Sequence, residues 1–469
     1  KEIEGMETPF VENSKRVQRQ LDSPITVIIG NPPYSIGQKS ANDNAQNQGY
    51  ILLEKKINDT YALESDAKSK RSLYDSYVKA FRWATDRLEE KGIIAFVTNS
   101  GWIDKLSFNG FRRHLESDFS DVYVINLRGG VRGKSGESAK REGGNVFNIQ
   151  TGVAITILVK QNKDSEKTRI SYYALDDYQN KDQKLVKIKS FEGIKGINTW
   201  DNIVPDERHD WIAKRNSSFE DYIPLFIRDK KDKHCFFSLQ SGGVVTSRDV
   251  WCYNSEKQNL ISSIKASIDF YNSEVTRYKR DGENADVKEF VNKSPNKFSW
   301  DRAQINSDLP KGRLYSFNVD SINICQYRPF FRQWGYMNRQ LNNCVYQMPQ
   351  IFPFITTQNT VILMSGTGGR KDYCCLVSDK IIDLNILNDG TQCFPLYWYE
   401  KRTGTQVNLF SDGQDEYIRH DAVTDFIFKR AREQYGPKVT KEDIFYYVYG
   451  FLHCPAYRET FANDLKKML

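Results

Sequence analysis

Four consecutive residues, Asn31-Pro32-Pro33-Tyr34, combine two hydrogen-bond acceptors, a rigid backbone and an aromatic ring. Each proline fixes its φ angle and lacks an N–H donor, and Asn31 is held extended because it precedes a proline. We therefore expect the Asn31 side-chain oxygen and the Pro32 carbonyl oxygen to point outward as acceptors, beside the flat face of Tyr34. Two acceptors next to a ring suit a planar amino group.

The chemistry that this arrangement favours is alkylation of the amino nitrogen. An exocyclic amine is a poor nucleophile because its lone pair is delocalised into its ring. Acceptors that bind its hydrogens favour the pyramidal form, and they stabilise the positive charge that develops at nitrogen. Stacking on Tyr34 would align the ring with a methyl donor. No general base is needed before attack, since the product sheds a very acidic proton. The alternative interpretation is a double-proline turn at a strand end.

The elements around the motif indicate a sheet. A β-branched run at residues 25–29 ends in Gly30 and is typical of a strand buried on both faces. After it, the pattern predicts a helix over 73–88 that ends at Lys91-Gly92, a buried strand at 93–97, a helix around 107–117, and strands at 121–127 and 152–160. This order predicts the second half of a doubly wound α/β sheet, with the motif at its carboxyl edge, where ligands bind.

The alternation of strands and helices stops near residue 161, at a hydrophilic joint. We predict a catalytic domain over 1–165 and a second domain over 166–469. The second domain has many aromatic-polar turns and is predicted to be mixed α+β, with a helical patch near 255–275 and a C-terminal helix that begins at a capping box, Thr440 to Asp443.

Composition bounds the class of protein. The 469 residues include 67 Lys and Arg against 60 Asp and Glu, a net charge of +7, which fits either a solvated surface or a polyanion partner. Aromatic residues, at 13%, can build a core or stack on bases. No apolar run is long enough to span a membrane. The eight cysteines and five histidines form no zinc spacing, which favours reduced thiols in a cytosolic protein.

The Asn-Pro-Pro-Tyr motif resembles that of the γ-type amino-methyltransferases, which use S-adenosylmethionine and methylate adenine in DNA. The resemblance implies a Rossmann-like methyltransferase sheet followed by a target recognition domain, with double-stranded DNA as partner. It also implies a second aromatic residue that closes on a flipped base. Phe147, which precedes the strand at 152–160, occupies that place. The alternative for Phe147 is a core residue at a strand start.

Further segments narrow the resemblance to type ISP restriction-modification enzymes of prokaryotes, in which a nuclease, a helicase-like ATPase, a methyltransferase and a target recognition domain share one chain. The segments that carry it include 27–35, 37–44, 73–77, 96–99, 126–129, 135–137, 141–144, Thr246-Ser247-Arg248-Asp249, Tyr327-Arg328-Pro329-Phe330 and 443–447. The similarity covers nearly the whole chain.

Two features depart from the family pattern. No Gly-containing donor motif stands before Asn31, so the main contacts to S-adenosylmethionine are expected upstream of Lys1, and the chain is interpreted as part of a longer polypeptide. The GxxxxGK[ST] phosphate loop of a helicase motor is also missing from the sequence. Gly366-Thr367-Gly368-Gly369 lacks its lysine and is interpreted as a turn.

A base inside a duplex cannot reach a sheet-edge loop, so the target adenine is expected to flip out. Segments 35–49 and 128–145 are predicted to flank the loop. Their cations are candidate phosphate contacts, although each also fits a solvated loop: Lys39, Arg128, Arg132, Lys134, Lys140 and Arg141. Base readout is expected from Asn, Gln and Arg residues within 240–400.

Two other functions remain open from the sequence. A planar amide is also a planar NH2 group, so the motif equally serves methylation of protein glutamine or of adenine in RNA. A DNA-binding specificity module without activity of its own is the third possibility, because the donor half of the site is absent from the sequence.

Overall fold

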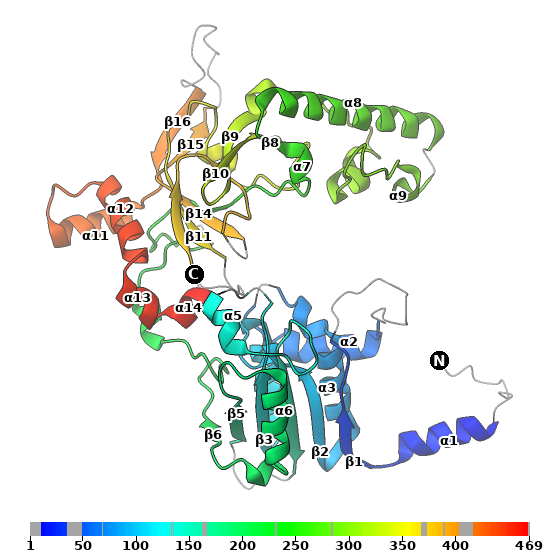
Figure 1. Cartoon of the computed structure of the whole chain (residues 1–469). Helices are drawn as coiled ribbons and strands as arrows, with labels where there is room; N and C mark the ends of the chain where they lie inside the picture. The colour runs from blue at the N-terminus through cyan, green and yellow to red at the C-terminus, as the bar shows by residue number, and fades with distance from the viewer. Residues whose placement is uncertain are drawn as a thin grey trace. The chain divides into compact units, whose positions relative to one another are not determined.

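The computed structural model describes residues 11–34, 49–67, 69–132, 134, 136–161, 167–229, 232–282, 285–366, 373–387, 390–402 and 416–467 (Figure 1). The chain divides into two compact units, Lys1–Arg215 and Asn216–Leu469, and each is described by itself. None of the helices in the described ranges combines the length and apolar character of a transmembrane segment.

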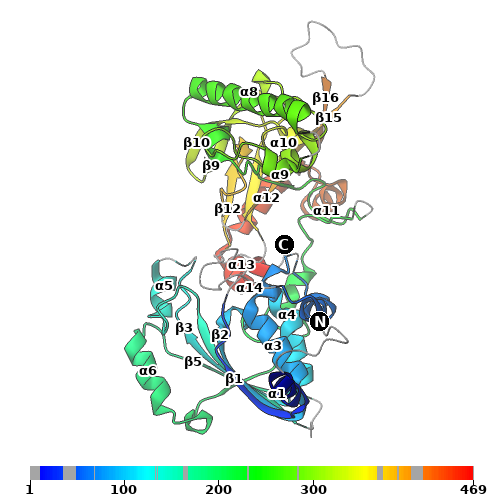
Figure 2. The same ribbon diagram turned by 90° about the vertical axis from the view of Figure 1, so that its right-hand side faces the viewer.

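The first unit is built on a six-stranded mixed sheet with the order β1-β2-β4-β3-β5-β6. Its strands are β1 (Ile25–Gly30), β2 (Leu88–Asn99), β3 (Asp121–Arg128), β4 (Val153–Lys160), β5 (Arg169–Ala174) and β6 (Asp201–Ile203). Its α-helices are α1 (Val11–Asp22), α2 (Ile51–Ile57), α3 (Ser76–Arg87), α4 (Asn109–Asp118), α5 (Gly136–Glu142) and α6 (Lys181–Ser190). Helices α3 and α4 lie on one side of the sheet and α6 on the other (Figure 2). This confirms the predicted α/β class.

The pairing of the strands brings several strand ends to one edge of this sheet. β1 is parallel to β2, with Gly30 paired to Phe96, and β3 is parallel to β5. β4 is inserted antiparallel between β2 and β3, so its first residue, Val153, pairs with both Asn99 and Arg128. The loop after Gly30 and the segment before Val153 therefore open on the same edge.

The prediction that the first strand is buried on both faces is wrong. Ile25 and Ile28 pack on the core, whereas Val27 is 53% and Ile29 78% exposed. Among the described residues, β1 is an edge strand whose second face is left uncovered, and apolar runs alone do not report which faces are covered. The predicted helix end at Lys91-Gly92 is also wrong, because β2 begins at Leu88.

The sheet of the first unit continues beyond the boundary predicted between residues 165 and 166. β5 pairs in parallel with β3, and β6 pairs with β5, so the compact units divide at Arg215 and Asn216 instead. The hydrophilic segment near residue 161 thus leads from β4 to β5 within one sheet. A second difference lies in the predicted basic loop at 128–145, where residues 136–142 form helix α5.

The second unit is mixed α+β, as predicted. It contains two four-stranded sheets, with the orders β13-β9-β10-β8 and β12-β11-β14-β7, and the pair β15-β16. The strands are β7 (Ser241–Gly242), β8 (Tyr253–Asn254), β9 (Ile322–Arg328), β10 (Phe331–Tyr336), β11 (Val361–Ser365), β12 (Cys375–Ser378), β13 (Ile381–Ile382), β14 (Thr391–Pro395), β15 (Tyr397–Lys401) and β16 (Tyr417–Asp421). The helices are α7 (Asp249–Cys252), α8 (Lys257–Asp281), α9 (Val287–Phe290), α10 (Met348–Ile351), α11 (Asp425–Tyr435), α12 (Lys441–Leu452), α13 (Pro455–Thr460) and α14 (Ala462–Lys467).

Two sequence-based predictions in the second unit are confirmed. The helical patch near 255–275 is the 25-residue helix α8. The capping box is formed, since the Thr440 side chain accepts from the Asp443 N–H while the Asp443 carboxylate accepts from the Thr440 N–H. The predicted turn at Gly366-Thr367-Gly368-Gly369 lies largely outside the described residues.

Candidate active site

The Asn31-Pro32-Pro33-Tyr34 segment leaves the carboxyl end of β1, directly after Gly30. Asn31 and Pro33 are exposed, and Pro32 and Tyr34 are partly buried. Asn31 is the first residue after the strand, and its exposed side chain leaves the amide available to a ligand. The position at the sheet edge is the one that the motif predicts.

Tyr34 ties this loop to the neighbouring strand. Its hydroxyl lies 3.1 Å from the Asn31 Oδ1 atom and 3.2 Å from the Val97 carbonyl oxygen of β2. Its ring packs against the core and is nearly perpendicular to the Tyr77 ring, with the ring centres 6.4 Å apart. Partial burial raises the pKa of the Tyr34 hydroxyl, so this group stays protonated and donates. An amide oxygen has two lone pairs, and Asn31 Oδ1 can therefore accept from Tyr34 and from a ligand.

The segment before β4 presents Phe147 at the same edge. Phe147 is 47% exposed, whereas its neighbour Val146 is buried. The alternative that Phe147 is a core residue is therefore excluded. Strands β1 and β4 are separated only by β2, so they run about 10 Å apart, two strand spacings. Gly30 is level with Thr156, and β4 extends three residues further, to Val153.

One residue that the sequence analysis missed, Asn145, organises the Phe147 segment. Its Oδ1 atom accepts from the Phe147 N–H at 2.9 Å and the Ile149 N–H at 3.3 Å. Its Nδ2 atom donates to the Gly129 and Thr151 carbonyl oxygens, at 3.1 and 2.7 Å. The only signal was the residue type, because Asn side chains commonly accept from the main-chain N–H two residues on and form an Asx turn.

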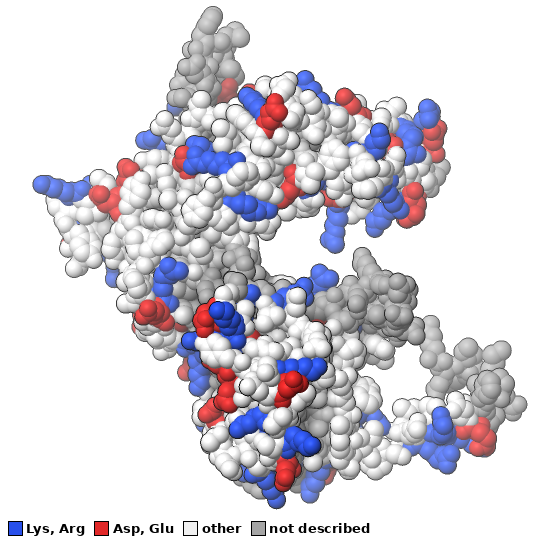
Figure 3. All heavy atoms as spheres, in the orientation of Figure 1, with Lys and Arg blue, Asp and Glu red and all other residues white. Residues whose placement is uncertain are grey.

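The candidate phosphate contacts differ in how they are held. Arg128 forms an ion pair with Asp177 at 2.6 Å, and Lys134 forms one with Glu142 at 2.6 Å. Arg132, Lys140 and Arg141 are exposed, and within the described part of the chain neither Arg132 nor Lys140 has an ion-pair partner. Lys39 lies outside the described residues. Figure 3 shows cationic and anionic side chains interspersed over the visible face of each unit, so this view shows no strongly basic surface.

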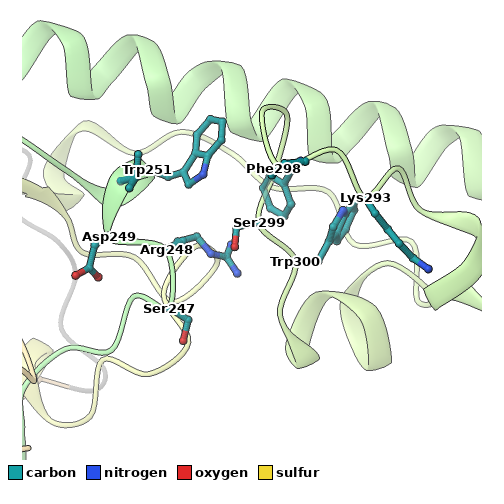
Figure 4. Close-up of a pocket in the computed structure, with 10 residues that line it drawn as sticks. Ser247, Arg248, Asp249, Trp251, Lys293, Phe298, Ser299 and Trp300 are labelled. Carbon is teal, nitrogen blue, oxygen red and sulfur yellow. The ribbon is translucent and has the colours of Figure 1, made fainter. Parts of the chain in front are cut away.

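The second unit contains a pocket of about 610 Å³ beside α7 (Figure 4). Arg248 and Phe298 are buried in it, and Trp251, Lys293, Ser299 and Trp300 contribute further side chains. The Arg248 guanidinium donates from Nη2 to Asp301 at 2.7 Å and Gln304 at 2.9 Å. It also lies over the Phe298 ring, 5.2 Å from its centre. These contacts join the start of α7 to Asp301 and Gln304, while the buried Nε and Nη1 atoms of Arg248 have no hydrogen-bond partner among the described residues.

Comparisons with known proteins identify the class. A family model for the Eco57I restriction-modification methylase matches residues 5–130, which include the Asn31 loop. A model for the type ISP C-terminal specificity domain matches residues 235–469, about half of the chain. The chain thus contains a restriction-modification methylase region followed by a specificity domain. A comparison with curated proteins finds no significant match.

Solved structures agree. The chain is 36% identical to a nuclease-deletion mutant of the type ISP enzyme LlaGI in complex with a DNA substrate mimic, with a TM-score of 0.81 over 98% of this chain and 41% of that chain. It is 33% identical to the ATP-dependent type ISP enzyme LlaBIII bound to DNA (TM-score 0.83, 98% and 29% covered). It is 35% identical to DrdV in a DNA complex (TM-score 0.81, 98% and 43% covered).

This chain belongs to the type ISP restriction-modification family. It spans less than half the length of each of these three relatives. All eight cysteines are free thiols, and no described group of His, Cys, Asp and Glu side chains is arranged to hold a metal ion.

Proposed function

We propose that the whole enzyme methylates the 6-amino group of adenine in double-stranded DNA, with S-adenosylmethionine as donor, at a site selected by the second unit. The observation that carries this proposal is the position of Asn31 and Tyr34 at a sheet edge that also presents Phe147. Acceptor oxygens and aromatic rings from two separate segments suit a flipped base that is gripped at its amino group and stacked.

Each residue of the two segments has a proposed role. Asn31 Oδ1 and the Pro32 carbonyl oxygen accept from the two amino hydrogens, while Pro32 and Pro33 keep the loop rigid. Tyr34 positions the Asn31 amide through its hydroxyl, and Tyr34 and Phe147 stack on the base. The amino nitrogen forms a bond to the methyl carbon as the carbon–sulfur bond of the donor breaks, and the nitrogen then loses a proton to water.

S-adenosylmethionine supplies an electrophilic methyl group when it is bound. Neutral acceptors fit this donor, because they stabilise the positive charge that the nitrogen gains during transfer. We assign no residue of this chain to holding the donor. Nuclease and helicase-like domains are proposed to share the full-length polypeptide, as in the type ISP pattern.

A substrate comparison tests the proposal. The full-length protein is incubated with labelled S-adenosylmethionine and, in parallel, with duplex DNA, transfer RNA and a glutamine-containing protein. We expect label in duplex DNA, and nucleoside digestion should place it in 6-methyladenine. Label found only in RNA or only in protein would show that adenine in RNA or glutamine, and not adenine in DNA, is the substrate. The absence of label from all three substrates would favour a specificity module without activity.

A further inference from the structure

Two of the sequence segments in the second unit that resemble the type ISP family, Thr246–Asp249 and Tyr327–Phe330, meet at one carboxylate. The Tyr327 hydroxyl donates to Asp249 Oδ2 at 3.1 Å, and Arg328 Nη2 lies 3.4 Å from the same oxygen. Figure 4 shows the Asp249 side chain pointing away from Arg248 and the aromatic side chains of the pocket. Asp249 therefore braces the neighbouring hairpin.

The turn of that hairpin, which β9 and β10 form, carries a highly solvent-exposed aromatic side chain, Phe330. Arg328 pairs with Phe331, so Pro329 and Phe330 form a two-residue connection. Phe330 is 94% exposed, more than any other large hydrophobic side chain in the described ranges, and Phe331 beside it is 49% exposed. A single exposed phenylalanine is not unusual on a protein surface. The evidence for a function of Phe330 is therefore the set of contacts that hold the turn carrying it.

The tip that carries Phe330 is held from inside the hairpin. Gln326, which is almost buried, donates to the Arg328 and Pro329 carbonyl oxygens at 2.9 and 3.2 Å. Its own side-chain oxygen accepts from Arg332 Nε at 3.1 Å. Proline fixes the first turn residue as well. Hydrogen bonds thus tie the turn to both strands. The turn therefore has little conformational entropy to lose on binding.

Contacts to neighbouring segments also hold the residues close to the turn. Arg328 Nη1 donates to Asp383 Oδ1 at 2.8 Å, and the Tyr253 hydroxyl donates to the other oxygen of this buried carboxylate at 3.1 Å. Arg332 is paired with Asp379 at 2.8 Å. The surroundings of Phe330 are therefore charged and hydrogen-bonded. An apolar protein partner would need an apolar rim around the phenylalanine, whereas a base stack is apolar between its planes and polar at its edges.

We infer that Phe330 is a wedge that inserts into the base stack of the DNA that this unit recognises. Apolar wedges of this kind separate two base pairs and unstack them. The inference rests on the proposed function only in that the second unit binds DNA. Phe330 would deform the DNA, whereas the Asn, Gln and Arg residues of this unit are expected to read its bases.

The experiment uses the full-length protein and a duplex selected by the wild type from a random pool. The fluorescent base 2-aminopurine is placed at successive positions, since its emission rises when it unstacks. For the wild type, we expect a rise at one base step that is separate from the rise at the flipped target base. Phe330→Ala should abolish the rise at this separate step and weaken binding by about tenfold or more, because the contacts that depend on the deformed duplex are lost. Phe330→Trp, which keeps a flat apolar side chain, should preserve both.

Tyr435→Ala is the matched control, because Tyr435 is a 73% exposed aromatic residue on α11 of the same unit. It should leave affinity and fluorescence unchanged. Wild-type affinity and an unchanged rise in Phe330→Ala would overturn the inference, as would weaker binding with the same fluorescence pattern, which would indicate a contact outside the stack. Failure of the wild type to bind any duplex would contradict the proposed function instead.

Discussion

At the residue scale, one side chain of the site has two roles. Tyr34 is proposed to stack on the base, yet its hydroxyl also lies within hydrogen-bond distance of Asn31 and of β2. The sequence predicted the first task from residue type. The second requires knowledge of which strand neighbours β1, and a motif does not contain that information.

Substitutions of Tyr34 separate these two tasks. Tyr34→Phe removes only the hydroxyl and should lower stability by about 1 kcal/mol while the base still stacks. Tyr34→Ala should in addition weaken stacking, a contribution of about 1–3 kcal/mol per base. Fluorescence of 2-aminopurine at the target position measures the flipped state. Equal fluorescence for the Phe and Ala variants would argue against stacking on Tyr34.

At the element scale, the sequence predicted the order of the strands in the first unit from residue 25 to residue 160. It predicted neither which strand faces are buried nor the extension of the sheet to β5 and β6. The run at residues 25–29 is as apolar as a fully buried strand, yet one face of β1 is exposed, since burial depends on what packs there. β5 follows a hydrophilic joint that is typical of a domain boundary. Helix α5 is short and exposed, so no apolar periodicity marks it.

The segment that carries Phe147 offers a test at this scale through two glycines. Gly136 and Gly143 both have positive φ angles, +56° and +66°. A Cβ at Gly136 would meet no described atom within 4 Å, whereas at Gly143 it would lie 2.0 Å from the Gln179 carbonyl oxygen. Gly136→Ala should therefore cost only backbone strain, about 1–2 kcal/mol.

Gly143→Ala should cost clearly more, on the order of 3 kcal/mol or above, because the backbone has to move. Urea unfolding of the two variants measures the difference. Since Gly143 lies close to Asn145 in the chain, methylation should also decrease more in this variant than in Gly136→Ala. Equal unfolding midpoints would show that the close approach to Gln179 is not maintained in solution.

At the scale of the whole molecule, the net charge of +7 is small, and ion pairs already engage several cations near the site. Arg132 and Lys140, which are exposed without ion-pair partners among the described residues, are better placed to contact phosphates than Lys134, which is paired with Glu142. From residue type alone, Arg132, Lys134 and Lys140 are equal candidates, because ion pairing depends on the fold.

Salt dependence tests that ranking. Arg132→Ala and Lys140→Ala should each weaken DNA binding at every sequence and reduce the slope of log affinity against log salt by about 1. Lys134→Ala should change the slope less, since its ammonium group is already neutralised. Binding isotherms from low to moderate salt provide the slopes, and an equal change for all three variants would contradict the ranking.

The central claim is that the Asn31 side-chain oxygen grips the amino group that is methylated. The most direct test is the rate of labelled methyl transfer to duplex DNA by the full-length enzyme and two variants, with DNA affinity measured in parallel. Asn31→Ala should lower the rate at least about 100-fold, comparable to the loss of one transition-state hydrogen bond, with little change in affinity. Asn31→Asp keeps an acceptor oxygen and should retain much of the activity. A normal rate in Asn31→Ala would contradict the account.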